Sequence, residues 1–503
     1  MTEDQKSRKY IKIAFVFFLF IIVFLIGLQL SNQHSIQKNK TSRQRITSEE
    51  TYNLPIITID VLNKNINTTT KVKAKLKIYD SKTGINKLSD KPKKEYNVLI
   101  RIRGNSTRLV PKKQYRIHIM NKNFKKTQEK KFLGMPAASE WILNAPFEDK
   151  SLVRNRIAYK VADKIMGWSP ETRYCNVFVR QADQKGNIKN YFKGLYLAIQ
   201  PIERAKDKVN IQKTNSNKPQ TSFIVQANRL HHDVKNAPIV NSYGKNIHIY
   251  DYPFIIDYPK KTLTSAQEKY IAQTISIFER SLYKTNIDDE YQQYIDEDTF
   301  VDYYIINEFF KNTDAGLLST YMYKNFGEKI KAGPVWDFNA AMGNSNLLSP
   351  YYDFKGFYMP RTPIFGKLIE HKEFAEKVIR RYHFLRKNYL SDTYIDNLID
   401  KNVKKISETQ KQNFKVWPIW LCNQFEMFKE YPDVFEKFGD NVSQIKNFVD
   451  KNPRYLQSTE NMATSYQQEI KKLKTFIKNR GHWMDKNIED LIKISNQKNE
   501  SNK

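Results

Sequence analysis

Two aspartates, Asp314 and Asp337, stand at the two ends of a short stretch that is patterned as a hairpin. Between them, the alternating segment 319–324 is followed by a turn around Gly327 and by a second apolar and polar segment that leads to Trp336. This pattern predicts a strand, a turn and a strand with one acid at each mouth, so that both carboxylates face one cleft. Such a pair suits metal-assisted phosphoryl transfer, because one carboxylate can orient or deprotonate a hydroxyl while the other holds a magnesium ion. The alternative is that Asp314 caps a turn and Asp337 makes a loop hydrogen bond.

A second segment has residue types that suit phosphate binding. The strand-like run from Tyr96 to Arg103 ends in the turn Gly104-Asn105-Ser106, and the next strand, 114–120, directly follows Lys112 and Lys113. Backbone N–H groups of such a turn and a lysine ammonium can both reach phosphate oxygens. The alternative is that the lysines simply face water.

A helix is predicted to start near Glu148 and Asp149, because acids suit the first helical turn, and to stop at Gly167. Glu148 or Asp149 could pair with a strand lysine, as the helix glutamate of kinases does. The alternative for both acids is helix capping.

The remaining pattern divides the chain into a β-rich first half and a helical second half. The length of 503 residues, with 40% hydrophobic and 13% aromatic residues, supports a substantial core. Further strands are predicted at 54–62, 71–79, 174–179, 194–200 and 222–228, and residues 230–262 are predicted to be irregular. Helices are predicted from Ser265 onwards, including 298–309, 365–369, 374–390, 394–414, 466–479 and 484–494, with Arg480-Gly481 separating the last two. The predicted fold class is therefore α+β, with the last residues, 496–503, as a disordered tail.

The N-terminus contains a candidate membrane anchor at residues 13–30. Residues 13–28 are all apolar or glycine, a basic tail of residues 1–12 precedes them, and a polar linker of residues 31–53 follows. A cleaved secretory signal would begin similarly, but no small-residue cleavage site follows, which favours an uncleaved signal-anchor. We therefore expect a single-pass cell-membrane protein whose C-terminal part is extracytoplasmic.

The charge and the metal-binding residue types limit the partners. The net charge of +31 is spread along the chain without a nucleic-acid motif, so an anionic lipid or wall polymer is the favoured charged partner. The alternative is a solvated surface that is rich in Lys and Asn. Cys175 and Cys422 form either one disulfide or two buried thiols, and the spacing of His231, His232 and His248 does not match a zinc site.

Several strings in this order resemble the spore-coat protein H (CotH) kinase family of atypical protein kinases. Asp337-Phe338-Asn339 is also similar to the Asp-Phe-Gly of protein kinases, with Asn in place of Gly. The segments that carry the family resemblance are 101–106 with 111–117, 141–155, 191–196, 312–343 and the helix from Tyr466 to Met484. The resemblance covers roughly residues 54–495.

The resemblance implies a kinase-like fold of two lobes, a β-sheet N-lobe at about 54–230 and a mainly helical C-lobe at 263–495, with ATP and Mg²⁺ or Mn²⁺ between them. It also implies transfer of the γ-phosphate to Ser or Thr of partner proteins. Carried over to this sequence, Asp314 is the catalytic acid or base, and Asp337 and Asn339 are metal ligands. The nucleotide-binding residues would be Lys113 or Lys112, Glu148 as the helix partner, and Arg103, Asn105 and Ser106. Lys113 is preferred because strand alternation puts it on the side of Tyr115 and Ile117.

The sequence also departs from the family pattern. Gln200, Gln226 and Asn228 stand where acidic residues are expected, and Ser319 stands where kinases have an Asn five residues after the catalytic Asp. These departures keep open an alternative function, a catalytically inactive structural or scaffold protein of the cell envelope.

Overall fold

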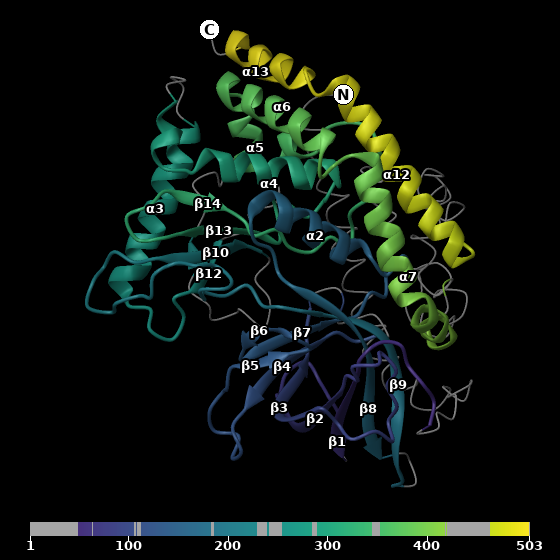
Figure 1. The fold of residues 1–503 in the computed structure, drawn as a ribbon. Helices are drawn as coiled ribbons and strands as arrows, with labels where there is room; N and C mark the ends of the chain where they lie inside the picture. Colours follow the sequence, from purple (N-terminus) through teal and green to yellow (C-terminus); the bar gives the residue numbers. More distant parts are fainter. Residues whose placement is uncertain are drawn as a thin grey trace, which may run out of the picture.

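The computed structural model describes residues 49–501 except 63, 105–106, 108–111, 183–185, 229–238, 241–253, 284–288, 345–352, 418 and 420–462. Its first half forms a β-barrel, and its second half is mainly helical (Figure 1). A second, smaller sheet lies between the barrel and the helices (Figure 1). The α+β class predicted from the sequence is therefore confirmed.

The barrel closes in the strand order β1-β2-β3-β4-β7-β9-β8, and it is closed by the parallel pairing of β1 with β8. Alternating residues of its strands fill the interior, for example Ile100, Ile102, Tyr115 and Ile117, all of which are buried. The short hairpin β5–β6 stands beside the barrel. The strands are β1 (Ile56–Leu62), β2 (Val72–Tyr79), β3 (Lys94–Ile102), β4 (Tyr115–Met120), β5 (Lys130–Phe132), β6 (Met135–Ala138), β7 (Glu140–Asn144), β8 (Thr172–Ala182) and β9 (Ile188–Ile199).

The second sheet has the strand order β11-β12-β10-β13-β14. Its strands are β10 (Phe223–Ala227), β11 (Ile239–Val240), β12 (Phe254–Tyr258), β13 (Thr320–Lys324) and β14 (Ile330–Ala332). The predicted hairpin is present, with Met322 opposite Ala332 and Lys324 opposite Ile330. Strand β12, in a region predicted to be irregular, was missed because polar residues flank its short apolar run.

The helices pack around this sheet and share one large apolar core with it and with α2. They are α2 (Arg154–Met166), α3 (Ser265–Tyr283), α4 (Glu297–Phe309), α5 (Pro363–Leu368), α6 (Lys372–Lys387), α7 (Asp392–Val416), α12 (Tyr466–Asn487) and α13 (Asp490–Ser501), with short 3₁₀ turns at Asp289–Gln293 and Met359–Arg361. Helices α7 and α12 lie side by side and reach from the helical part towards the barrel (Figure 1). Helix α13 extends beyond the predicted end at Ile494.

Two predicted helix boundaries were wrong. Helix α2 starts at Arg154 because Leu152 has a φ of 64°, outside the helical region, and Asp149 accepts a hydrogen bond from the Arg154 backbone from outside the helix. Helix α12 continues through Gly481, where a break was predicted. A Cβ at Gly481 would lie 2.8 Å from Cζ of Arg386, so the glycine accommodates a guanidinium of α6 rather than ending the helix.

The predicted anchor at residues 13–30 lies outside the described residues, as do Cys422 and the three histidines of the irregular segment. Within the described ranges, no helix combines the length and apolar character needed to cross a membrane. Cys175 is a free, buried thiol on β8, and burial raises its pKa above the usual range.

Candidate functional site

The two predicted acids lie on segments that are joined directly to each other. Helix α4 leads to Asn312, whose Nδ2 donates to Asn307 Oδ1 at 3.1 Å and to the Trp336 carbonyl at 3.5 Å. The segment before β13, which carries Asp314, is therefore tied to the segment after β14, which carries Asp337. Both side chains are partly exposed, so each remains accessible to a ligand.

Helix α2 holds the segment Asp337-Phe338-Asn339 by three hydrogen bonds. The Asp337 N–H donates to the Tyr159 hydroxyl at 3.2 Å, and the Phe338 N–H donates to Asn155 Oδ1 at 2.7 Å. Asn155 Nδ2 in turn donates to Asn339 Oδ1 at 2.7 Å. Because this contact fixes the orientation of the amide, the oxygen of Asn339 keeps one lone pair for another partner. Asp337 has a φ of 56°, and this network supports the unusual backbone.

Three carboxylates are electrostatically coupled at this place. Burial and the negative charges of Asp337 and Asp314 raise the pKa of Glu148 to about 7, against the smaller effect of Lys150. Burial also raises the pKa of Asp337, although the positive charge of Arg103 opposes the shift. Water also reaches the Glu148 side chain, which is exposed, and screens part of this shift. Asp314 and Asp337 therefore lie close enough to Glu148 for their charges to influence its protonation.

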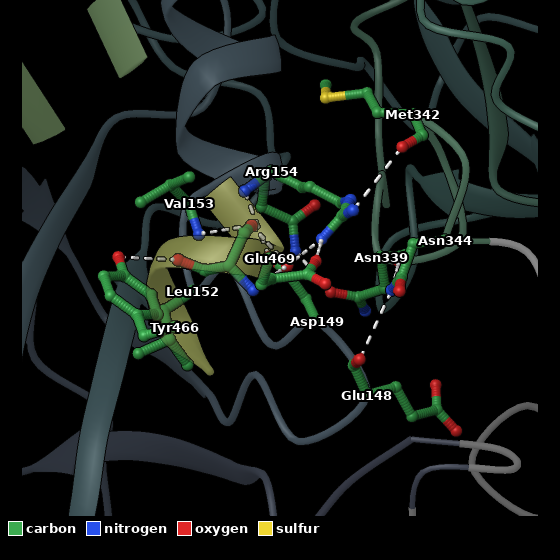
Figure 2. Close-up of polar contacts among 12 residues, drawn as sticks. Glu148, Asp149, Leu152, Val153, Arg154, Asn339, Met342, Asn344, Tyr466 and Glu469 are labelled. Atoms are coloured by element: carbon green, nitrogen blue, oxygen red, sulfur yellow. Dashed lines mark hydrogen bonds and ion pairs between the residues drawn. The ribbon is translucent and has the colours of Figure 1, made fainter. Parts of the chain in front are cut away.

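The loop that carries Glu148 is anchored to the C-terminal helix α12. Arg154 Nη1 donates to Asp149 at 2.6 Å and to Glu469 at 2.8 Å, and Tyr466 donates from its hydroxyl to the Ser151 carbonyl at 3.1 Å (Figure 2). The side chain of Glu148 points away from this buried cluster (Figure 2). Asn344 Nδ2 joins the Glu148 carbonyl, at 3.4 Å, to the Asn339 carbonyl, at 2.7 Å. This network links Glu148 to the segment that carries Asp337. The contact between Arg154 and Glu469 of α12 was not predicted, because these residues are 315 positions apart in the chain.

The two candidate lysines have different surroundings. Lys112 is fully buried, and its ammonium donates to the Leu195 carbonyl at 2.7 Å and to Asn413 Oδ1 at 2.8 Å. Lys112 therefore connects β9 of the barrel with helix α7. Lys113 is partly buried, and burial lowers its pKa to about 8. Strand β4 begins only at Tyr115, so strand alternation does not decide the direction of Lys113.

The positive charge of Arg103 acts on Asp337, and Arg103 Nη1 donates to Gln114 Oε1 at 2.9 Å. Arg101 and Arg116, which were not predicted as site residues, occupy neighbouring positions on β3 and β4. The sequence signal for Arg101 is the repeat of arginine at alternate positions, 101 and 103, just before the turn. The predicted residues Asn105 and Ser106 lie outside the described residues.

The positions that depart from the family pattern make defined contacts. Gln226 Nε2 donates to Asp257 Oδ2 at 2.7 Å, so strand β12 supplies a carboxylate beside the position where an acid was expected on β10. Gln200 is fully buried and accepts from the Glu171 N–H at 3.1 Å. Ser319 is buried with a φ of 52° directly before β13. The first of these contacts places a carboxylate beside Gln226, on a strand that was not predicted.

The donor set fits a magnesium ion that is shared with a substrate. Within the described part of the chain, no three His, Cys, Asp or Glu residues are grouped so as to hold a metal by themselves. Mg²⁺ commonly takes only one or two protein oxygens and completes its coordination with water and substrate phosphates. The Asp337 carboxylate and the oriented Asn339 amide oxygen are oxygen donors of the type that Mg²⁺ takes.

Comparison with known proteins gives concordant results. The sequence model of the family described as "CotH kinase protein" matches residues 100–484. The chain is also 21% identical over 355 residues to "Inner spore coat protein H" of Bacillus subtilis (strain 168), an alignment that covers 70% of this chain and 86% of that protein. The matched segment includes every candidate site residue named above.

Proposed function

The chain belongs to the CotH kinase protein family, and from this membership and the arrangement of its acids we propose that it is an atypical protein kinase. It would transfer the γ-phosphate of ATP to Ser or Thr hydroxyls of surface or envelope proteins. The name of the Bacillus relative, a spore coat protein, supports a location at a surface or coat. The barrel and the helical half would act as the two lobes of a kinase-like fold, with the nucleotide bound where they meet.

The observation that carries this proposal is the hydrogen-bonded framework by which α2 holds the segment Asp337-Phe338-Asn339, and by which Asn312 ties that segment to the one that carries Asp314. Asp337 and Asn339 would hold Mg²⁺ or Mn²⁺, which neutralises phosphate charge when bound. Asp314 would orient the acceptor hydroxyl and accept its proton as the oxygen attacks the γ-phosphorus. The new O–P bond then forms while the bond from that phosphorus to the bridging oxygen breaks, and ADP leaves.

Transfer of labelled phosphate tests this function. Full-length protein would be incubated with labelled ATP, Mg²⁺ or Mn²⁺, and dephosphorylated casein, with labelling of the chain itself followed in parallel. We expect label with the parent and its loss in both Asp314→Ala and Asp337→Ala. Asp400→Ala is the matched control, because the Asp400 carboxylate is 62% exposed on α7 and pairs with Lys474 at the surface. Retained transfer in Asp337→Ala would refute the assigned role of that residue.

The competing function is a catalytically inactive scaffold of the cell envelope. It is favoured by the departures at Gln200, Gln226, Asn228 and Ser319. A ligand that binds the folded protein raises its apparent stability, so thermal unfolding with and without ATP and Mg²⁺ separates the two functions. Stabilisation supports the kinase, whereas the absence of both label and stabilisation supports the scaffold.

A further inference from the structure

The phosphates of a bound nucleotide need several positively charged partners, more than the two lysines before β4 provide. The ammonium of Lys112 is already engaged by Leu195 and Asn413 in the joint between β9 and α7. Burial lowers the pKa of Lys113 to about 8, so Lys113 still carries most of its positive charge near pH 7 but supplies only a single charge. The positive charge at this face of the barrel comes instead from arginines, which stay protonated.

Three arginines share the outer face of β3 and β4. Arg101 lies opposite Arg116 in the antiparallel pairing, and the neighbouring pair, Ile102 and Tyr115, points into the barrel core. Arg103 follows two residues after Arg101, and its N–H donates to the carbonyl of Gln114 at 3.1 Å, which continues the same ladder. Because side chains alternate between the two faces of a strand, all three guanidinium groups leave the barrel on one side.

This cluster carries more positive than negative charge. Glu140 is the carboxylate beside it, with Arg116 Nε at 3.1 Å and His118 Nδ1 at 3.6 Å. Burial and the charge of Arg116 lower the pKa of Arg103, and burial with Arg101 and Arg116 lowers the pKa of Lys71. Like charges held together in this way are stabilised by a bound anion.

Two observations point to where such an anion would lie. Arg103 Nε is buried and finds no hydrogen-bond acceptor in the described part of the chain, so the guanidinium retains a donor for a ligand. The charges that influence the pKa of Arg103 include those of Arg116, Asp337 and Tyr321. The acids that influence the pKa of Glu148 are Asp337 and Asp314. Asp337 is therefore close both to the arginine Arg103 and to the carboxylate of Glu148.

We propose that Arg101, Arg103 and Arg116 bind the phosphate groups of the donor nucleotide, in the place of a strand lysine. The triphosphate would lie between these arginines and the metal ligand Asp337, and the acceptor hydroxyl would approach from the side of Asp314. Planar guanidinium groups suit this role because they form paired hydrogen bonds to phosphate oxygens. The inference rests on the proposed kinase function and identifies which side of that site takes the nucleotide.

The number of phosphates on the ligand provides the test. Binding of ATP, ADP, AMP and inorganic tripolyphosphate to the full-length protein would be measured by calorimetry with Mg²⁺. We expect affinity to fall from ATP to AMP, and Arg101→Gln and Arg103→Gln to weaken ATP by about tenfold to a hundredfold. AMP should be affected less, because it offers fewer phosphate contacts. Arg103→Lys, which keeps the charge and loses the planar fork, should fall between parent and Arg103→Gln.

The controls distinguish failure of this inference from failure of the proposed function. Arg180→Gln removes an arginine of β8 that pairs with Asp60 and should leave ATP affinity unchanged. Thermal unfolding verifies that each variant is folded, and Arg103→Lys serves as the second variant if a glutamine variant is not. Unchanged ATP affinity in the folded arginine variants, or a loss seen only in Lys113→Met, would overturn the arginine site and leave the kinase standing. Failure of the parent to bind any nucleotide would overturn both.

Discussion

Replacing Arg480 with Met should destabilise the protein strongly, because it isolates a buried carboxylate. Arg480 on α12 and Glu308 on α4 are both 0% exposed and form an ion pair. The guanidinium also donates to the carbonyls of Phe354 and Gly356, at 2.7 and 2.8 Å. The Glu308 carboxylate also accepts hydrogen bonds from the backbone N–H groups of Tyr358 and Met359. Helix α4 delivers the chain to the loop of Asp314, so this pair also supports the candidate site.

The expected loss in the free energy of unfolding follows from the contacts that Glu308 keeps when Arg480 is replaced. Without Arg480, the Glu308 carboxylate keeps backbone donors at 2.7 to 3.1 Å but loses the guanidinium with which it forms its ion pair. Removal of one member of a buried pair costs about 3–5 kcal/mol in the free energy of unfolding. The double variant Arg480→Met with Glu308→Gln should recover part of this loss, because the amide can still accept the backbone hydrogen bonds and leaves no buried charge.

The assay is equilibrium unfolding in guanidinium chloride of the parent, both single variants and the double variant. Arg180→Met is the control, because Arg180 forms an ion pair with Asp60 at 2.7 Å but its side chain is 47% exposed. Exposed pairs contribute about 0–1 kcal/mol, so the control should lose little. A loss below about 1 kcal/mol for Arg480→Met, or a double variant less stable than Arg480→Met alone, would refute the reasoning.

Three further predictions concern the site and its supports. Because the folded-state pKa of Glu148 is raised to about 7, the native protein binds this proton more tightly, and the free energy of unfolding should fall as pH rises from about 4.5 to 7. Denaturant titrations at pH 5 and 8 should show a smaller fall in Glu148→Gln, and equal falls would contradict the assignment. Asn155→Ala leaves the Phe338 N–H without its acceptor and releases Asn339, so it should cost about 1–3 kcal/mol and raise the Mg²⁺ concentration needed for half-maximal transfer, measured by metal titration. Gly194→Ala should lower the melting temperature, because Gly194 has a φ of 97° and the new Cβ would lie 2.5 Å from Asn413 Oδ1; an unchanged melting temperature would show that this joint adjusts freely.

Local patterns in the sequence were enough to predict the elements around the site. The alternation in 319–324, the turn at Gly327 and the second apolar segment correspond to the observed hairpin of β13 and β14. The barrel strands with clear period-two patterns were also predicted, and the C-terminal end of α2 was found because Gly167 adopts the left-handed conformation that closes a helix. These features depend on neighbours in the chain, which the sequence displays directly.

Local patterns failed where a distant residue decides the outcome. Gly481 has the local signature of a helix end, yet α12 continues through it, and the residue is a glycine because an arginine of α6 occupies the space where a Cβ would lie. The predicted start of α2 was misplaced because Asp149 acts as a cap from a turn outside the helix. The closure of the barrel by β1 and β8 was likewise not predicted, since parallel pairing of strands far apart in the chain leaves no local signal.

The sequence by itself determined which residue types are available for chemistry, namely Asp314, Asp337 and Asn339 in one stretch and a basic strand end in another. Only the tertiary structure decided their surroundings. It placed Glu148 beside the two aspartates and buried Lys112 against α7. The physical reason is that a charge responds to distance in space, and these groups are brought together by elements more than a hundred residues apart.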